Sequence, residues 1–295
     1  MTSNPTPSMS TGLSTGLSLK AQHFDDALAV PGVWFEIHPE NYFVAGGQRL
    51  KTLDRIREDH ELSLHGVGLS LAADVVDADA HLTQLKALVD RFQPRLMSEH
   101  LAWSMRGQVY QPDLLPFPRT QAALTRMVQA VDRAQTRLQR QILIENPSHY
   151  LRLKGHAYSE IEFLDALARR TGCGLLIDVN NVFVSAANIG GSAEAYIDAI
   201  PADLVGEIHV AGHSEDPNLG PDLLIDSHDA AVSPAVWRLA ERLLRRIGPR
   251  PLLIERDGKV PDFAELWRER EAGEAIWRAG AVAKASSREV VHAGR

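Results

Sequence analysis

Short apolar runs that end in polar side chains recur along the chain. The clearest is the run CGLLI at 173–177, which is followed by Asp178, Asn180 and Asn181. An apolar run of this length is typical of a strand that is buried on both faces. A carboxylate at the end of such a strand is costly to desolvate unless it meets a cation or hydrogen-bond donors. The pattern therefore predicts buried strands whose ends carry chemistry.

Eight segments fit this description, and amphipathic helical patterns separate them. Strands are expected within 17–20, 33–38, 62–68, 96–101, 142–147, 173–183, 204–210 and 252–258. Apolar residues recur at helical spacing between most of them, for example over 82–89, 124–138, 161–168 and 236–244. This alternation predicts an α/β fold, a single-domain (β/α)₈ TIM barrel. A doubly wound open sheet is the alternative, but the glycine fingerprint of a dinucleotide site is absent after the first strand.

Composition narrows the class of protein. The chain has 295 residues, of which 44% are hydrophobic, and we expect the barrel to occupy 16–280 between disordered tails at 1–15 and 281–295. A formal charge of -7 with scattered Lys and Arg argues against nucleic acid as a partner. No window is apolar enough for a membrane span, and the N-terminus does not resemble a secretory signal. A single cysteine, Cys173, excludes a disulfide framework and fits a reducing, cytoplasmic location.

The polar strand ends supply candidate metal ligands. A TIM barrel places its active site at the carboxyl ends of the strands, so side chains far apart in sequence would meet there. Imidazole and carboxylate together suit iron, manganese, zinc or cobalt. The candidates outnumber the roughly four to six ligands of one ion, which favours a site with two or three ions. The candidate ligands are His65, His100, Glu145, Asp178, Asn181, His209, His213, Asp226, His228 and Glu255.

Each of these residues also has an ordinary structural interpretation, and only the joint pattern favours a metal, because several isolated buried charges would be costly without a cation. Glu145 lies in a middle strand and is well placed to bridge two ions. Arg119, Asn146 and Glu207 are weaker candidates for substrate contact, and Glu207 shares a strand face with His209 by period two. The remaining histidines outside strand ends are interpreted as structural or solvated, and Cys173 as a packing residue.

The ordered motifs resemble those of a known family. They are HGVG at 65–68, SEHLAWS at 98–104, IENP at 144–147, DVNN at 178–181, EIHVAGH at 207–213, DSHD at 226–229 and IERDG at 254–258. In this order they resemble the multinuclear non-haem iron-dependent oxidative enzymes, a bacterial family that includes the catalytic subunit of methanobactin biosynthesis. The resemblance covers roughly Gly16 to Trp277.

This resemblance implies a TIM barrel with two or three iron ions that uses O₂ to modify residues, often cysteines, of a ribosomally made precursor peptide. It also implies a small partner protein that presents the peptide. Carried over by position, one iron would be held by His65, His100 and Glu145. Glu145 would bridge to a second iron at Asp178, His213 and Glu255, and further iron would be held by Asn181, His209, Asp226 and His228.

Two other functions are compatible with the ligand types alone. A divalent-metal barrel hydrolase or isomerase would use zinc or manganese to activate water or a sugar hydroxyl. A non-enzymatic metal-binding or scaffolding protein would need a closed coordination sphere, whereas ligands at a barrel mouth favour an open one. Metal identity and O₂ consumption distinguish the oxidase from the first alternative.

Overall fold

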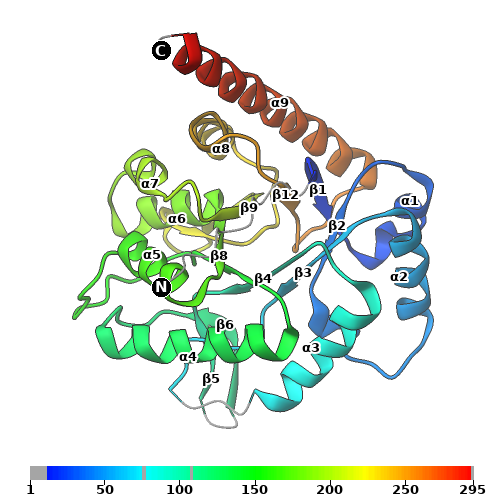
Figure 1. The fold of residues 1–295 in the computed structure, drawn as a ribbon, viewed down its shortest axis with the longest axis horizontal. Coiled ribbons are helices and arrows are strands. Elements are labelled where there is room, and N and C mark those ends of the chain that lie inside the picture. The colour runs from blue at the N-terminus through cyan, green and yellow to red at the C-terminus, as the bar shows by residue number, and fades with distance from the viewer. Residues whose placement is uncertain (1–11, 75–77, 107–108, 294–295) are drawn as a thin grey trace.

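The computed structural model describes residues 12–74, 78–106 and 109–293. Eight parallel strands close into one barrel in the order β1-β12-β9-β8-β7-β4-β3-β2, with β1 also paired to β2 (Figure 1). The predicted TIM barrel is therefore confirmed. The barrel strands are β1 (Thr15–Ser18), β2 (Phe35–Ile37), β3 (Leu62–Gly66), β4 (Leu96–His100), β7 (Leu143–Glu145), β8 (Gly174–Asp178), β9 (Val205–Ala211) and β12 (Leu252–Glu255).

Helices surround the barrel on the outside (Figure 1). They are α1 (Phe24–Ala29), α2 (Gln48–Asp59), α3 (Asp79–Phe92), α4 (Gln121–Leu138), α5 (Glu160–Thr171), α6 (Val179–Ile189), α7 (Ala193–Ala199), α8 (Pro234–Ile247) and α9 (Phe263–Ala293), with short 3₁₀ turns η1 (Ala21–His23) and η2 (Pro39–Tyr42). Helix α9 packs along α8 and β1 and continues to Ala293, beyond Gly280, where the sequence predicts the start of a tail. Residues 1–11 of the expected N-terminal tail lie outside the described residues, and β1 begins at Thr15, the last residue of that tail.

Two antiparallel hairpins that the sequence pattern did not predict follow the carboxyl ends of barrel strands. Strands β5 (Trp103–Arg106) and β6 (Val109–Leu115) follow β4, and strands β10 (Ser214–Asp216) and β11 (Gly220–Ile225) follow β9. Since both hairpins leave from the ends where the polar motifs lie, they flank the mouth of the barrel.

The run 173–183 divides into a strand and a helix. Strand β8 ends at Asp178, and α6 starts at the next residue, with the Asp178 carboxylate accepting a hydrogen bond from the Asn181 backbone N–H. This is the usual geometry of an N-cap aspartate. One oxygen of Asp178 therefore caps the helix. The other, Oδ2, has no hydrogen-bond partner among the described residues.

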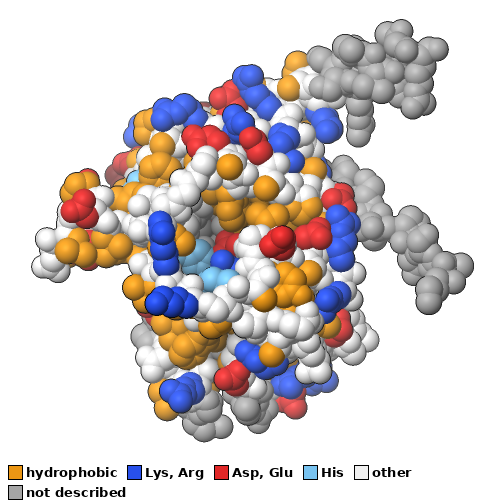
Figure 2. Space-filling model, turned by 90° about the vertical axis from the view of Figure 1, so that its left-hand side faces the viewer, with side chains coloured by type: hydrophobic (Ala, Val, Ile, Leu, Met, Phe, Trp, Pro, Cys, Tyr) orange, Lys and Arg blue, Asp and Glu red, His pale blue; other side chains and the backbone are white. Residues whose placement is uncertain are grey.

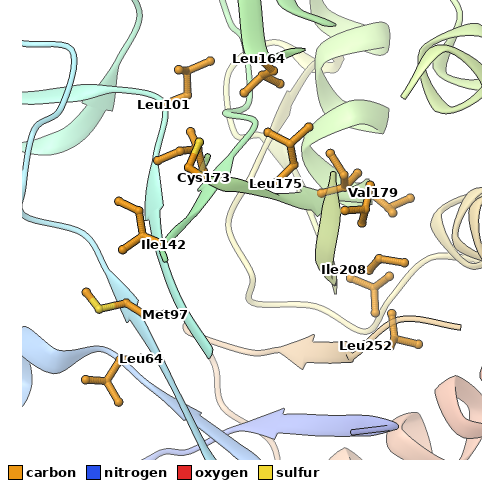
Figure 3. Close-up of a cluster of buried hydrophobic side chains, with 14 of the residues drawn as sticks. Leu64, Met97, Leu101, Ile142, Leu164, Cys173, Leu175, Val179, Ile208 and Leu252 are labelled. Atoms are coloured by element: carbon orange, nitrogen blue, oxygen red, sulfur yellow. The ribbon is translucent and has the colours of Figure 1, made fainter. Parts of the chain in front are cut away.

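Alternate residues on each strand face opposite sides of the barrel wall. Outward residues such as Leu64, Met97 and Leu175 pack with helix residues such as Leu164 in the main hydrophobic core (Figure 3). Inward residues change character along the barrel axis. Leu96, Leu143 and Leu176 form a small apolar cluster of their own near the amino ends. Two residues further along these three strands stand Ser98, Glu145 and Asp178, so the closed apolar floor leads directly into a polar interior.

Candidate metal centre

One half of the centre is formed by two histidines around a single carboxylate. The Nε2 atoms of His65 and His100 each lie 3.1 Å from Oε2 of Glu145. All three residues are buried, and they come from the adjacent strands β3, β4 and β7. The other nitrogen of each ring has a partner: Nδ1 of His65 is 2.7 Å from the Ser98 hydroxyl, and Nδ1 of His100 is 3.2 Å from the Gly66 carbonyl. Both rings therefore present Nε2 to the Glu145 carboxylate.

The second half lies across the barrel interior, on β8, β9 and β12. Nδ1 of His209 lies 3.1 Å from Oε2 of Glu255, and one ligand atom each of Glu145, Asp178 and His209 lie within 4.8 Å of one another. Asn181 joins this half, because its side-chain amide lies 3.4 Å from Oε1 of Glu145. Glu145 therefore faces both halves, as its predicted bridging position requires.

A third group lies beside Glu255, towards the β10–β11 hairpin. Nε2 of His228 is 2.8 Å from Oδ1 of Asp226, and its Nδ1 is 3.6 Å from Oε2 of Glu255. Asn180 connects this pair to His213: its amide donates to Oδ1 of Asp226, and its carbonyl oxygen is 2.8 Å from Nδ1 of His213. His228 has a positive φ of 49°, an uncommon conformation that its backbone hydrogen bond to the Gly212 carbonyl helps to hold.

The donor set fits metal ions. Metal–ligand bonds to imidazole and carboxylate are about 2.0–2.2 Å long, so neighbouring ligands of one ion stand about 3 Å apart. The three 3.1 Å separations around Glu145 and Glu255 have this value. Moreover, Asp178 Oδ2 and Asn181 Oδ1 are buried without a hydrogen-bond partner among the described residues. Such oxygens are costly to bury unless a cation binds them.

Ionisation of these groups depends strongly on their neighbours. Burial alone would lower the pKa of His65, but the Glu145 and Glu36 charges outweigh it and raise that pKa to about 10. Burial would raise the pKa of Glu145, but His100 and His65 lower it to about 2. For Asp178, burial and the charges of Asp226 and Glu145 act together and raise the pKa well above its usual value. A bound metal would favour neutral imidazoles and charged carboxylates instead, because these are the forms that bind it. Metal binding would therefore release protons.

The predicted ligands all lie at or beside the mouth. The resemblance grouped His213 with Asp178 and Glu255, and His209 with the ligands of further iron, whereas the geometry groups these two histidines the other way round. His209, not His213, adjoins Asp178 and Glu255, because it lies within β9 and points into the barrel. His213 lies two residues past the end of that strand and contacts Asn180 and the Phe183 ring. The sequence could not settle this, because both histidines belong to one motif.

The three weaker candidates for substrate contact lie in different surroundings, and Arg119 lines a cavity with Phe117 and His149. Asn146 is buried, and its amide bridges β7 to β8 through two hydrogen bonds to the Asp178 backbone. Glu207 is buried beneath His209. Arg119 is directed to Glu160 and to the Tyr158 carbonyl, outside the cluster.

Two further groups at the centre were not among the predicted ligands. Glu36 lies beneath His209, and its signal in the sequence is a lone carboxylate inside an apolar strand. His38 lies with its Nε2 3.7 Å from carboxylate oxygens of both Glu255 and Asp257, and Lys20 also pairs with Asp257. Figure 2 shows one face of the molecule hollowed, with histidine and acidic side chains inside the hollow and Lys or Arg side chains on its rim.

Comparison with known proteins decides the family. The chain matches the family described as "RiPP precursor modification enzyme MbnB/TglH/ChrH" over residues 14–278, where RiPP denotes a ribosomally synthesised and post-translationally modified peptide. The chain belongs to this family. Members similar to it include a "UPF0276 protein" of Caulobacter vibrioides, 59% identical over 273 residues that cover 92% of this chain and 97% of the relative. Another, from Rhizobium meliloti, is 46% identical over 88% of this chain and 86% of its own length. The family resemblance found in the sequence is thus confirmed.

Solved structures resemble the chain in fold alone. A D-psicose 3-epimerase is 14% identical with a TM-score of 0.58, covering 91% of this chain and 99% of its own. A D-tagatose 3-epimerase-like protein is 12% identical with a TM-score of 0.59, covering 90% and 99%. At these identities the similarity extends to the TIM barrel and not to the substrate. Among the described residues, no helix combines the length and apolar character needed to cross a bilayer.

The single cysteine is expected to be unreactive in the folded protein. Cys173 is 2% exposed and precedes β8, at the end of the barrel away from the centre, and burial raises the pKa of its thiol to about 11. Only the thiolate is nucleophilic, so a thiol reagent should modify Cys173 in denaturant and leave it unmodified in the native protein. With a disulfide reagent that releases a coloured thiolate, the absorbance of that product measures the fraction of Cys173 that has reacted. Stoichiometric labelling of the native protein would contradict the packing role.

Proposed function

We propose that this protein is a multinuclear non-haem iron-dependent oxidase that uses O₂ to modify a residue, a cysteine in the simplest case, of a ribosomally made precursor peptide. One observation carries the proposal: Glu145 lies 3.1 Å from two histidine Nε2 atoms and also faces Asp178 and His209. Such a shared carboxylate belongs to a centre with more than one ion. Membership of a RiPP precursor modification family supports a peptide as the substrate.

The donor set supports iron as the metal. Imidazole, carboxylate and amide oxygen suit iron, and thiolate is absent from the cluster. His65, His100 and Glu145 would hold one ion, and Glu145, Asp178, His209 and Glu255 a second. Asp226 and His228, whose side chains lie 2.8 Å apart, would hold a third. Iron in such a centre supplies O₂ binding and one-electron oxidation, which the side chains of this protein do not provide.

The protein's own residues prepare the centre. Ser98 and the Gly66 carbonyl fix the rings of His65 and His100 so that Nε2 faces inward. Asn146 ties β7 to β8 through the Asp178 backbone and so holds Glu145 and Asp178 at a constant separation. The apolar floor of Leu96, Leu143 and Leu176 closes the barrel below, which leaves the hollow as the route for a peptide side chain.

A small partner protein is part of the proposal, because the described chain is one barrel with two short hairpins and contains no separate peptide-binding domain in its described part. A cytoplasmic location fits a substrate whose thiol must stay reduced until it reaches the centre.

Co-expression tests the proposal. The enzyme would be produced with iron, a cysteine-bearing precursor peptide encoded beside its gene and the neighbouring candidate partner, and the peptide mass would be measured. We expect an O₂-dependent mass change that needs the partner and disappears in a Cys→Ser peptide. An unchanged mass with iron, O₂ and partner present would contradict the proposal. Turnover of a small metabolite without O₂ would instead favour the divalent-metal hydrolase or isomerase.

A further inference from the structure

Three histidines of the centre, His65, His100 and His209, differ in what contacts the far side of each ring. The partners of His65 and His100 are neutral: a serine hydroxyl at 2.7 Å and a backbone carbonyl at 3.2 Å. In both, Nδ1 is occupied and Nε2 faces Glu145. A neutral partner orients an imidazole but adds little to its electron-donating power.

His209 has the opposite orientation and charged partners. Its Nδ1 lies 3.1 Å from Oε2 of Glu255, whereas its Nε2 lies 3.4 Å from Oε1 of Glu36 and 3.7 Å from Oε1 of Glu207. The ring is fully buried, and the two carboxylates are 2% and 0% exposed.

The environment of these carboxylates leaves His209 as their principal donor. Oε2 of Glu36 accepts a hydrogen bond from the Ser63 hydroxyl at 2.8 Å. Oε1 of Glu36 and both oxygens of Glu207 are buried without a hydrogen-bond partner among the described residues, and so is Nε2 of His209. Buried acceptors are costly without donors, so an N–H on Nε2 directed between the two oxygens lowers the free energy of the native state.

We propose that Glu36 and Glu207 are positioning residues that hold the proton of His209 on Nε2, fix Nδ1 as its metal-binding atom, and make the metal position beside His209 the more electron-rich of the two. This inference rests on the proposed iron centre. A carboxylate behind a ligand histidine raises the basicity of the ligand, which stabilises the higher oxidation state of the bound metal. The two positions are therefore unequal: the one beside His209 favours ferric iron, and the one beside His65 and His100 favours ferrous iron.

Redox titration of iron-loaded protein, followed by Mössbauer and EPR spectroscopy without peptide, tests the inference. At the potential where the first-oxidised position of the wild type is half ferric, Glu207→Gln and Glu36→Gln should each lower its ferric-to-ferrous ratio about tenfold, which corresponds to a tenfold loss of affinity for ferric iron alone, at the lower end of what substitutions behind metal ligands cost in metal affinity. Glu58→Gln is the matched control, because it removes a carboxylate that is exposed on α2 and remote from the centre, and it should leave that ratio unchanged. A crystal structure of the iron form should show Nδ1 of His209 on the metal.

Several results would overturn the inference. They are an unchanged ratio in both Gln variants, coordination of His209 through Nε2, and loss of one ion per chain in both variants, which would mean that Glu36, Glu207 and His209 hold an ion of their own. The two Gln variants are separate, so that failure of one to fold leaves the other, with thermal unfolding as the check. A wild type without an iron pair would overturn the proposed function as well, whereas unchanged ratios in an iron-loaded protein would overturn this inference alone.

Discussion

Replacing Glu145 by Gln is expected to remove iron from both halves of the centre and to lower the rate of peptide modification at least ~10²-fold, the upper end of what changes merely behind metal ligands cost. Oε2 of this carboxylate is shared by His65 and His100, and the group also faces Asp178 and His209. An amide of the same shape lacks the charge that balances two cations, so neither ion retains its ligand set. Iron content after anaerobic reconstitution and the modification rate are the measurements.

Glu58→Gln is the matched control for this variant, because Glu58 is exposed on α2 and remote from the centre. It should keep wild-type iron and activity. Circular dichroism should show an intact barrel in Glu145→Gln, since the strands around position 145 are held by backbone ladders and by an apolar exterior. If Glu145→Gln binds full iron and turns over normally, Glu145 does not bridge the ions.

Replacing Glu160 by Gln is expected to lower the free energy of unfolding by about 3–5 kcal/mol, the range observed when one partner of a buried ion pair is removed. Glu160 accepts hydrogen bonds from His149 and Tyr196 and pairs with Arg119 at 3.2 Å. These partners come from the loop after β7, from α7 and from the segment before α4. The carboxylate therefore joins three segments next to the mouth, and its charge is paired with that of Arg119.

Acidification provides a second readout for this site. Burial would raise the pKa of Glu160, but its hydrogen bond and charge contact with His149 and the charge of Arg119 outweigh burial and lower it. A lowered pKa in the folded state stabilises the protein above the unfolded-state pKa, and this contribution is lost as pH falls through the folded value. The difference between wild type and Glu160→Gln in denaturant titrations should therefore shrink on acidification. A difference below about 1 kcal/mol at neutral pH would show that the pair contributes no more than a surface salt bridge.

The strands and the clustering of many candidate ligands could be predicted because buried parallel strands leave a strong signal. A run of apolar residues that ends in His, Glu or Asp buries a polar side chain at the end of its strand, and barrel closure brings such ends together, as it does for His65, Glu145, Asp178 and Glu255. The hairpins were not found, because β6 and β11 carry mixed polar and apolar residues without clear alternation.

Which side chains point into the barrel depends on the residue at which each strand ends. The spacing of hydrophobic residues along the sequence does not define that residue. His209 and His213 share one motif, and only the end of β9 at Ala211 determines which of them points into the barrel. The sequence left the role of Glu36 open, because a polar residue at the end of the second strand can equally contact substrate or a helix end, whereas barrel closure places it beside His209. From sequence, Arg119 could be interpreted as a residue that contacts an anionic substrate group. In the structure its guanidinium pairs with Glu160, which lies 41 residues further along the chain.

The most direct test of the proposed iron centre is the number of iron ions per chain in protein prepared anaerobically with iron supplied, measured by elemental analysis against a quantitative protein assay. We expect more than one iron per chain, with a Mössbauer spectrum that shows iron in unequal environments, because Glu145 faces two sets of candidate ligands. A stoichiometry of one or less after careful reconstitution, or zinc alone in the active protein, would contradict it.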